Sequence, residues 1–229
     1  RQQDVTFIPF DDLEALEDEL KKGDVCGVIF EPIQGVGGLD IPDDDFVLGM
    51  NTLCEKYDTC LIADEVQSGF SRSGNFFAFQ QNNIKPHVIT MAKGMGNGFP
   101  IGGILVHPDL KPKYGMLGTT FGGNHLACSA SLAVLEIIKK DKLQHHAKSM
   151  ETYFRAKAEK IKGIKIKGRG LMLGLAFDFE VGPLRKSLIY EKNIFTGGSS
   201  NKNVLRILPP LTVQKKHFDR FFEALEDLL

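Results

Sequence analysis

Short apolar runs alternate with amphipathic segments along the first part of the chain. Residues 11–22 and 44–57 place their apolar side chains on one helical stripe, which predicts two helices. Four further runs have the length and apolar content of buried strands. They read VCGVIF, TCLIAD, HVITMA and GGILVH in chain order. Because strands and helices alternate, the pattern predicts an α/β fold with a mainly parallel sheet.

In the later part of the chain, short strands are mixed with helices and no longer alternate with them regularly. Residues 124–162 predict a helix that breaks near Asp141, and the run IKIKGRGLMLGLAFDF predicts short strands. A short helix from about Pro183, the strand VLRIL and a last helix follow. The last helix carries five apolar side chains on one face, namely Phe218, Phe221, Phe222, Leu225 and Leu229.

This change in the order of helices and strands predicts two domains. Residues 1–128 are expected to form the C-terminal part of a large domain, and residues 129–229 a small α+β domain. The boundary falls inside the helix near residue 128.

Composition and charge indicate a globular protein and argue against some classes of partner. The chain has 229 residues with 42% hydrophobic content, enough for a core, and its formal charge is -1. Without a basic surplus, neither nucleic acid nor an anionic membrane is an expected partner. No apolar run is long enough to cross a bilayer. The chain opens with Arg1 rather than Met, so we expect the native N-terminus to lie upstream.

The cysteines and histidines do not predict a metal site. The four cysteines form no CxxC pair, and buried, reduced thiols in a cytoplasmic protein are the expected state. His145 and His146 are adjacent on a predicted helix and therefore point in different directions.

Two of the predicted strands end in charged residues. Asp64 and Glu65 end one strand, and Lys93 follows the next among glycines. In open α/β sheets, ligands bind at the carboxyl ends of the strands, so the acid and the amine are expected at one crevice. An ion pair between surface loops is the alternative, and it would contribute little to stability.

The functional interpretation of Lys93 is a lysine that forms a Schiff base. Such a lysine must be partly desolvated to act as a neutral nucleophile. The small residues of MAKGMGNG would let a ligand approach the backbone closely. A carboxylate opposite would hold a protonated ring nitrogen, which pyridoxal phosphate needs in order to withdraw electrons from a substrate carbanion.

Several motifs make the chain similar to one known family. They are EPIQGVGG, LIADEVQSGFSRSG, KPHVITMAKGMGNGFPIGG, GTTFGGNHLACSASLAVLE and LRILPPLTV. In this order and spacing they resemble the class III pyridoxal-phosphate-dependent aminotransferases, above all the acetylornithine branch, close to ornithine and succinylornithine aminotransferases. The resemblance covers almost the whole chain. It implies the type I fold of these enzymes, with a partial large domain and a small C-terminal domain.

The resemblance also implies roles for five residues. Lys93 matches the lysine that binds the cofactor and moves the proton, and Asp64 matches the aspartate paired to the pyridine nitrogen. Gln67 matches the glutamine near the ring hydroxyl, and Thr120 the threonine that binds cofactor phosphate across a dimer interface. Arg206 matches the arginine that holds a carboxylate of 2-oxoglutarate or glutamate. Taken alone, Thr120 would be read as a cap of a turn or helix, and Arg206 as an ordinary strand arginine.

The chain departs from the family pattern in two ways. Val36 stands in QGVGG where relatives commonly carry a glutamate that pairs with the matching arginine, so Arg206 is expected to remain free for carboxylates. The front of the family fold is also absent, including a phosphate-binding loop and an aromatic residue that stacks on the cofactor. We therefore expect an exposed sheet edge, exposed apolar surface and poor solubility of this chain alone.

The reaction implied is transfer of the terminal amino group of N-acetylornithine to 2-oxoglutarate in cytoplasmic arginine biosynthesis, by a homodimer. Ornithine, succinylornithine and 4-aminobutyrate remain alternative donors. A non-catalytic fragment that serves as an interaction or oligomerisation module is the alternative from another class.

Overall fold

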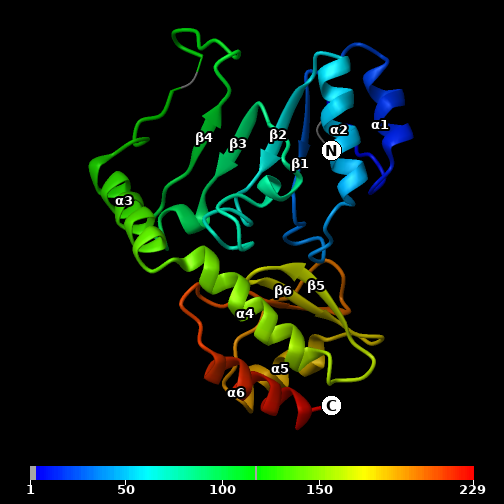
Figure 1. Cartoon of the computed structure of the whole chain (residues 1–229), viewed down its shortest axis with the longest axis vertical. Coiled ribbons are helices and arrows are strands. Elements are labelled where there is room, and N and C mark those ends of the chain that lie inside the picture. Colours follow the sequence, from blue (N-terminus) through cyan, green and yellow to red (C-terminus); the bar gives the residue numbers. More distant parts are fainter. Residues whose placement is uncertain (1–3, 117) are drawn as a thin grey trace.

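The computed structural model describes residues 4–116 and 118–229, which form two sheets and the helices around them (Figure 1). The helices and strands predicted from the sequence are all confirmed. The elements of the first part are α1 (Leu13–Leu20), β1 (Gly27–Phe30), α2 (Asp44–Lys56), β2 (Cys60–Asp64), β3 (Val88–Met91), β4 (Gly103–Val106) and α3 (His125–Lys140). Those of the second part are α4 (Leu143–Ala158), β5 (Lys165–Arg169), β6 (Met172–Ala176), α5 (Gly182–Tyr190), β7 (Val204–Ile207) and α6 (Lys215–Glu226).

Local chemistry explains where the helices begin and end. Asp12 caps α1 by accepting a hydrogen bond from the Ala15 amide at 2.9 Å, and Asn124 caps α3 through the Ala127 amide at 3.0 Å. The break expected near Asp141 is confirmed. Lys142, between α3 and α4, has φ of +52° and cannot continue the α3 helix in that left-handed conformation.

The first sheet has the strand order β1-β2-β3-β4. The pairs β1/β2 and β2/β3 are parallel, and only β3/β4 is antiparallel, which confirms a mainly parallel α/β sheet. The register places Asp64 opposite Thr90, so the carboxyl ends of β2 and β3 lie side by side. In Figure 1 the strands run from β1, beside α2, to β4, the strand nearest α3.

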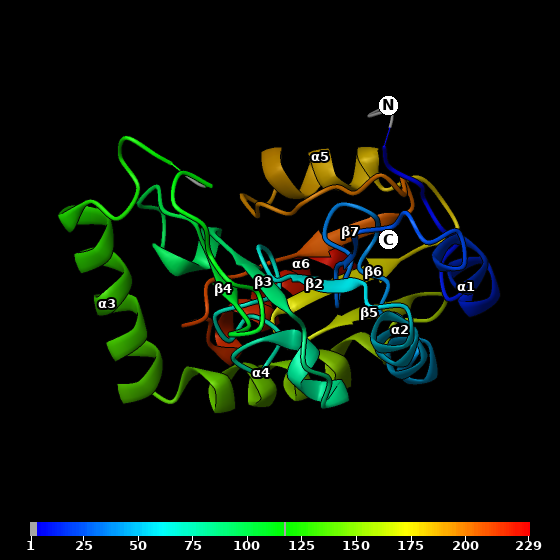
Figure 2. The same cartoon turned by 90° about the horizontal axis from the view of Figure 1, so that it is seen from above.

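The second sheet is antiparallel, with the order β5-β6-β7. Figure 2 shows α5 and α4 on either side of α6 around this sheet. These three helices and one face of the sheet share a core with Phe154 at its centre, fully buried against Phe218 and Phe222. The expected apolar face of the last helix is correct except at Leu229. That residue lies beyond the end of α6 and is 56% exposed.

The apolar core is divided in a way that bears on the domain proposal. One cluster of buried side chains extends from Leu16 to Leu143, and another begins at Ala147 and extends to Leu225. A small third cluster joins Ile33 and Leu39 to Met172 of β6. We retain the division into residues 1–128 and 129–229 as a proposal; packing changes from one cluster to the other beyond residue 128, between α3 and the first turns of α4.

Apolar side chains are exposed on α3 and on β4. Exposed apolar surface was expected from the sequence, but the prediction that GGILVH is a buried strand is wrong, because β4 is the last strand of the sheet among the described residues. Ile104, Leu105 and Val106 of β4 are each almost half exposed, and Leu126 and Leu132 of α3 are 72% and 60% exposed. Beyond β4, no described strand pairs with the sheet. This surface is therefore open to another polypeptide segment.

The expectation of four buried thiols is wrong for two cysteines, and a third, Cys60, is only half-buried. Cys26 and Cys128 are exposed, whereas Cys54 is buried and its desolvation raises the thiol pKa to about 12. The described residues contain no group of three or more potential metal ligands. They also contain no helix with both the length and the apolar character of a membrane span.

Candidate active site

Asp64 and Lys93 lie at the same edge of the first sheet. Asp64 is the last residue of β2 and stands opposite Thr90 of β3, and Lys93 follows Thr90 after two further residues. A one-turn 3₁₀ helix, Lys93–Met95, begins there. No ion pair joins the two side chains within residues 4–116 and 118–229, so the surface ion pair considered from the sequence is absent from this part of the chain.

The Asp64 carboxylate is oriented by its neighbours. Its Oδ1 accepts hydrogen bonds from the Val66 amide and the Thr90 hydroxyl, both at 3.0 Å. Its Oδ2 has no hydrogen-bond partner among the described residues, and the side chain is only partly buried. One oxygen is thus fixed by the protein while the other can accept a proton-bearing nitrogen from a ligand.

The backbone at Lys93 is strained. Its φ of +43° lies in the left-handed region, which a residue with a side chain seldom occupies and which recurs at functional sites. The side chain lines a cavity of about 370 Å³ together with Gln67. The partial desolvation expected of Lys93 is not found, because this cavity opens to solvent and the side chain is exposed.

The Gln67 side chain lies against Gly35, which in turn contacts Arg206. A Cβ added to Gly35 would lie 1.8 Å from Nε2 of Gln67, so a larger residue at position 35 would require the Gln67 side chain to move. The Gly35 carbonyl accepts a hydrogen bond from Nη1 of Arg206 at 2.8 Å, and the Gly35 amide donates to Glu31 at 2.7 Å. The loop that carries QGVGG therefore connects a residue near Lys93 with a residue of the second sheet.

Arg206 faces this loop because of its place in β7. Leu205 and Ile207 point into the core of the second part, so the alternation along the strand directs Arg206 to the other face. Burial lowers the pKa of its guanidinium, the nearby Arg185 lowers it further, and Glu31 opposes both. Arg206 Nε is buried without a hydrogen-bond partner among the described residues. Such a cation is suited to an anionic ligand.

Thr120 is not brought to these residues. It is exposed on the irregular segment before α3 and does not line the cavity that contains Lys93 and Gln67. Asn124, rather than Thr120, caps α3. A role for Thr120 toward cofactor phosphate stays a prediction.

Glu65 has a different environment from its neighbour Asp64. It is fully buried and accepts hydrogen bonds from the Ser68 hydroxyl at 2.6 Å and the Phe79 amide at 2.9 Å. Burial raises the pKa of its carboxyl group, and these two donors oppose the shift. Glu65 therefore holds the segment after β2 in place and does not face the cavity.

Sequence reasoning missed three residues around the site. Thr90 orients Asp64, Glu31 lies near Arg206, and Arg72 lines the same cavity as Lys93. A strand alignment that pairs TCLIAD with HVITMA would have placed Thr90 beside Asp64. Nothing in the pattern around Glu31 or Arg72 indicates their contacts, which come from segments distant in sequence.

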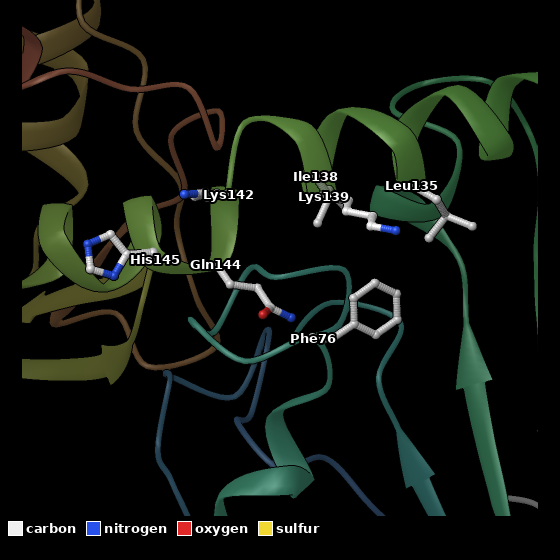
Figure 3. Close-up of a pocket in the computed structure, with 7 residues that line it drawn as sticks. All are labelled: Phe76, Leu135, Ile138, Lys139, Lys142, Gln144 and His145. Carbon is white, nitrogen blue, oxygen red and sulfur yellow. The ribbon is translucent and has the colours of Figure 1, made fainter.

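A second cavity, of about 640 Å³, lies where α3 meets α4 (Figure 3). Figure 3 shows Gln144 of α4 directed toward Phe76 and His145 directed away from it. Apolar carbon provides most of its lining, and it contains none of the five site residues predicted from the sequence. This cavity contributes nothing to the candidate site.

Comparison with known proteins decides the family. The family model for aminotransferase class III matches residues 2–229. The chain belongs to the class III aminotransferases. This confirms the resemblance inferred from the motifs.

Acetylornithine and ornithine aminotransferases are among the relatives of this class III chain. Acetylornithine aminotransferase of Aquifex aeolicus is 42% identical over 209 residues, which cover 90% of this chain and 54% of that protein. The enzyme of the same name from Methanocaldococcus jannaschii is 38% identical over 229 residues, covering 97% and 57%. The chain thus spans a little more than half the length of the curated relatives it matches.

Solved structures agree with this placement. The ornithine aminotransferase of Plasmodium yoelii superposes with a TM-score of 0.88 at 32% identity, covering 96% of this chain and 61% of that one. The acetylornithine aminotransferase of Elizabethkingia anophelis has a TM-score of 0.84 at 28% identity, covering 96% and 58%. The class III fold is therefore present over the described residues.

Proposed function

We propose that this class III chain carries the lysine-bearing part of a pyridoxal-phosphate-dependent aminotransferase. The observation that carries the proposal is the arrangement of Asp64 and Lys93. Adjacent strands deliver them to one sheet edge, no ion pair consumes either charge, and Asp64 keeps one carboxylate oxygen unbonded among the described residues.

The donor set fits pyridoxal phosphate. Lys93 would offer an amine to its aldehyde, Asp64 an acceptor to its ring nitrogen, and Gln67 an amide to its ring hydroxyl. We assign the phosphate to Thr120 from the neighbouring subunit of a homodimer, following the family resemblance. When bound, the cofactor supplies an electron sink for the negative charge that forms at the substrate carbon.

The protein residues then have separate tasks. Lys93 moves a proton through Nζ to and from the substrate carbon, which is general acid and base catalysis. Asp64 would accept the protonated ring nitrogen of the cofactor, and Thr90 holds Asp64 in the orientation for this. Arg206 binds a carboxylate of 2-oxoglutarate or glutamate, because a guanidinium can donate two parallel hydrogen bonds to it.

N-acetylornithine is the proposed amino donor and 2-oxoglutarate the proposed acceptor. The relatives named above from Aquifex aeolicus and Methanocaldococcus jannaschii are acetylornithine aminotransferases, which supports this choice. Ornithine is the second candidate, supported by the likeness to the Plasmodium yoelii enzyme. With either donor, we propose a cytoplasmic place in amino-acid metabolism.

Covalent labelling tests the cofactor assignment. The chain is incubated with pyridoxal phosphate, reduced with borohydride and mapped by peptide mass spectrometry. We expect one dominant label at Lys93 that is lost in Lys93→Ala and retained in Lys85→Ala, which removes an exposed lysine that lies before β3. Scattered labelling of surface lysines would overturn the assignment for this chain. Glutamate production from N-acetylornithine, ornithine and 4-aminobutyrate then ranks the donors.

A further inference from the structure

Arg72 is a mostly enclosed cation that the proposed reaction does not use. It follows Asp64 by eight residues, in the loop after β2. Desolvation lowers the pKa of its guanidinium to about 10, yet no carboxylate within residues 4–116 and 118–229 pairs with it. Burial of a cation without a counter-ion costs free energy. We therefore expect the contacts of Arg72 to serve the structure or the function of the site.

Among the described residues, the hydrogen-bond partners of the Arg72 guanidinium are backbone carbonyls of the second part. Its Nη1 donates to the Leu171 carbonyl at 3.2 Å and also to the Pro209 carbonyl. The backbone adds a third connection, since the Leu171 amide donates to the Arg72 carbonyl at 2.8 Å. These bonds join residues that are 99 and 137 positions apart in the sequence.

The two carbonyls lie just beyond the adjacent ends of β6 and β7, since β6 begins at Met172 and β7 ends at Ile207. In the β6/β7 pair, Leu173 stands opposite Ile207, so continuing the register by two residues places Leu171 opposite Pro209. Pro209 has no amide hydrogen and cannot extend the ladder as a donor. Arg72 therefore donates to one backbone carbonyl beside each strand, at the point where the β6/β7 pairing stops.

Close packing also restricts the backbone of the turn before β6, at Gly170. Gly170 precedes Leu171 and has φ of +62°. A Cβ added there would lie 2.3 Å from the carbonyl carbon of Ser73 and 2.6 Å from the Arg72 oxygen. The loop that carries Arg72 and the turn before β6 are thus fitted backbone to backbone, and only glycine allows it.

The candidate site residues lie on both sides of this junction. Asp64 and Gln67 precede Arg72 in the same segment, and Arg206 precedes Pro209 by three residues on β7. Resting on the function proposed above, we propose that Arg72 is a positioning residue: it fixes the carboxylate-binding Arg206 at the correct place relative to the cofactor residues. The substrate class that depends on it is the dicarboxylate acceptor.

Three variants of the full chain test this role. Arg72→Met removes the donors at similar length, and Arg72→Lys keeps a cation with several donors. Arg220→Met is the matched control, since that arginine is exposed on α6 and its one partner in the described part of the chain is the Lys192 carbonyl at 3.3 Å. Each is assayed for thermal unfolding, for labelling at Lys93 by pyridoxal phosphate and borohydride, and for calorimetric binding of glutarate, an unreactive dicarboxylate.

We expect Arg72→Met to weaken glutarate binding about tenfold or more while keeping the label at Lys93. Arg72→Lys should recover most of the affinity, and Arg220→Met should match the wild type. Unchanged glutarate affinity in a folded Arg72→Met would overturn the positioning role. So would parallel loss of labelling, glutarate binding and thermal stability in both Arg72 variants, which would make the residue merely structural. A wild-type chain without label at Lys93 would instead overturn the proposed function, and the positioning role with it.

Discussion

The Thr90 hydroxyl donates to Oδ1 of Asp64 across 3.0 Å, from the neighbouring strand. Two parallel strands in fixed register thus supply both the acid of the candidate site and the group that orients it. The same strand that carries Thr90 leads to Lys93. The spacing of acid and amine is therefore determined by the sheet itself and not by a flexible loop.

Thr90→Val tests this orientation. Valine preserves the shape of threonine but cannot donate, so Asp64 loses one of the two donors to Oδ1. Loss of one hydrogen bond of about 1 kcal/mol should weaken pyridoxal phosphate binding about fivefold. Absorbance titration with the cofactor measures this, and Thr90→Ser should restore the affinity. Equal affinity for all three proteins would show that Thr90 does not orient the acid.

Glu65 should make stability depend on pH. Burial raises its pKa above the ordinary value of 4.5, so the folded chain holds the proton more strongly than the unfolded chain does. As pH rises from about 4.5 through the folded pKa, this group therefore lowers the free energy of unfolding.

Glu65→Gln removes that titration while it keeps an oxygen for the Phe79 amide. We expect its stability, relative to wild type, to improve progressively as pH rises through this window. Urea unfolding at a series of pH values gives the comparison. A constant difference between the two proteins at every pH would contradict the expected burial of charge.

The apolar patterns predicted the α-helices and strands of the described residues, because most of these elements bury one stripe or face. They did not predict the short 3₁₀ helices Ala78–Asn82 and Lys93–Met95. Leu229 was misplaced because the stripe was continued past Glu226, where the helix ends. The exposure of Cys26 and Cys128 could not be read from residue type, since burial depends on which surfaces meet.

Contacts between segments distant in sequence could not be predicted from the sequence patterns. Asp64 and Lys93 were predicted together because parallel strands end at one edge. The link from Gln67 through Gly35 to Arg206 depends on how the two sheets face each other. Local patterns carry no signal for such an arrangement, and the same holds for the carbonyls that Arg72 binds.

The core of the second part should depend strongly on Phe154. Its ring is 0% exposed and packs against Phe218, Phe221 and Phe222, with centroids 5.0–6.3 Å apart. Phe154→Ala should lower the free energy of unfolding by about 3–5 kcal/mol, because it leaves a cavity. Phe195→Ala is the control, because Phe195 is 84% exposed. Its free energy of unfolding should change by no more than about 0.5 kcal/mol. Chemical denaturation that gave similar losses for both would contradict this packing.

The exposed apolar surface of α3 should cause self-association of the isolated chain. Leu132 and Ile137 are 60% and 49% exposed on this helix. Replacing both with Gln should reduce association, since it removes apolar area without adding charge. Tyr190→Gln is the control, because Tyr190 is 81% exposed on α5, away from this surface. Light scattering across a concentration series should separate them; equal scattering by the α3 variant and wild type would exclude α3 as the cause.

Val36 offers a test of substrate choice at Arg206. Its side chain is 56% exposed, and its carbonyl accepts a hydrogen bond from the Ser200 amide at 2.8 Å, which fixes the loop beside Arg206. Arg206 bonds to the preceding carbonyl, that of Gly35, at 2.8 Å, so a carboxylate at position 36 would lie close to the guanidinium.

Val36→Glu should therefore compete with the dicarboxylate for Arg206 and raise its KM severalfold, on the scale of about 1 kcal/mol for a partly exposed charge pair. The KM of the amino donor should change less, which alters the ratio of the two half-reactions. Val36→Gln controls for size without the charge. Steady-state kinetics with each substrate varied in turn gives both constants. If the KM ratio is unchanged in Val36→Glu, or shifts equally in Val36→Gln, pairing at this position does not govern how Arg206 selects its ligand.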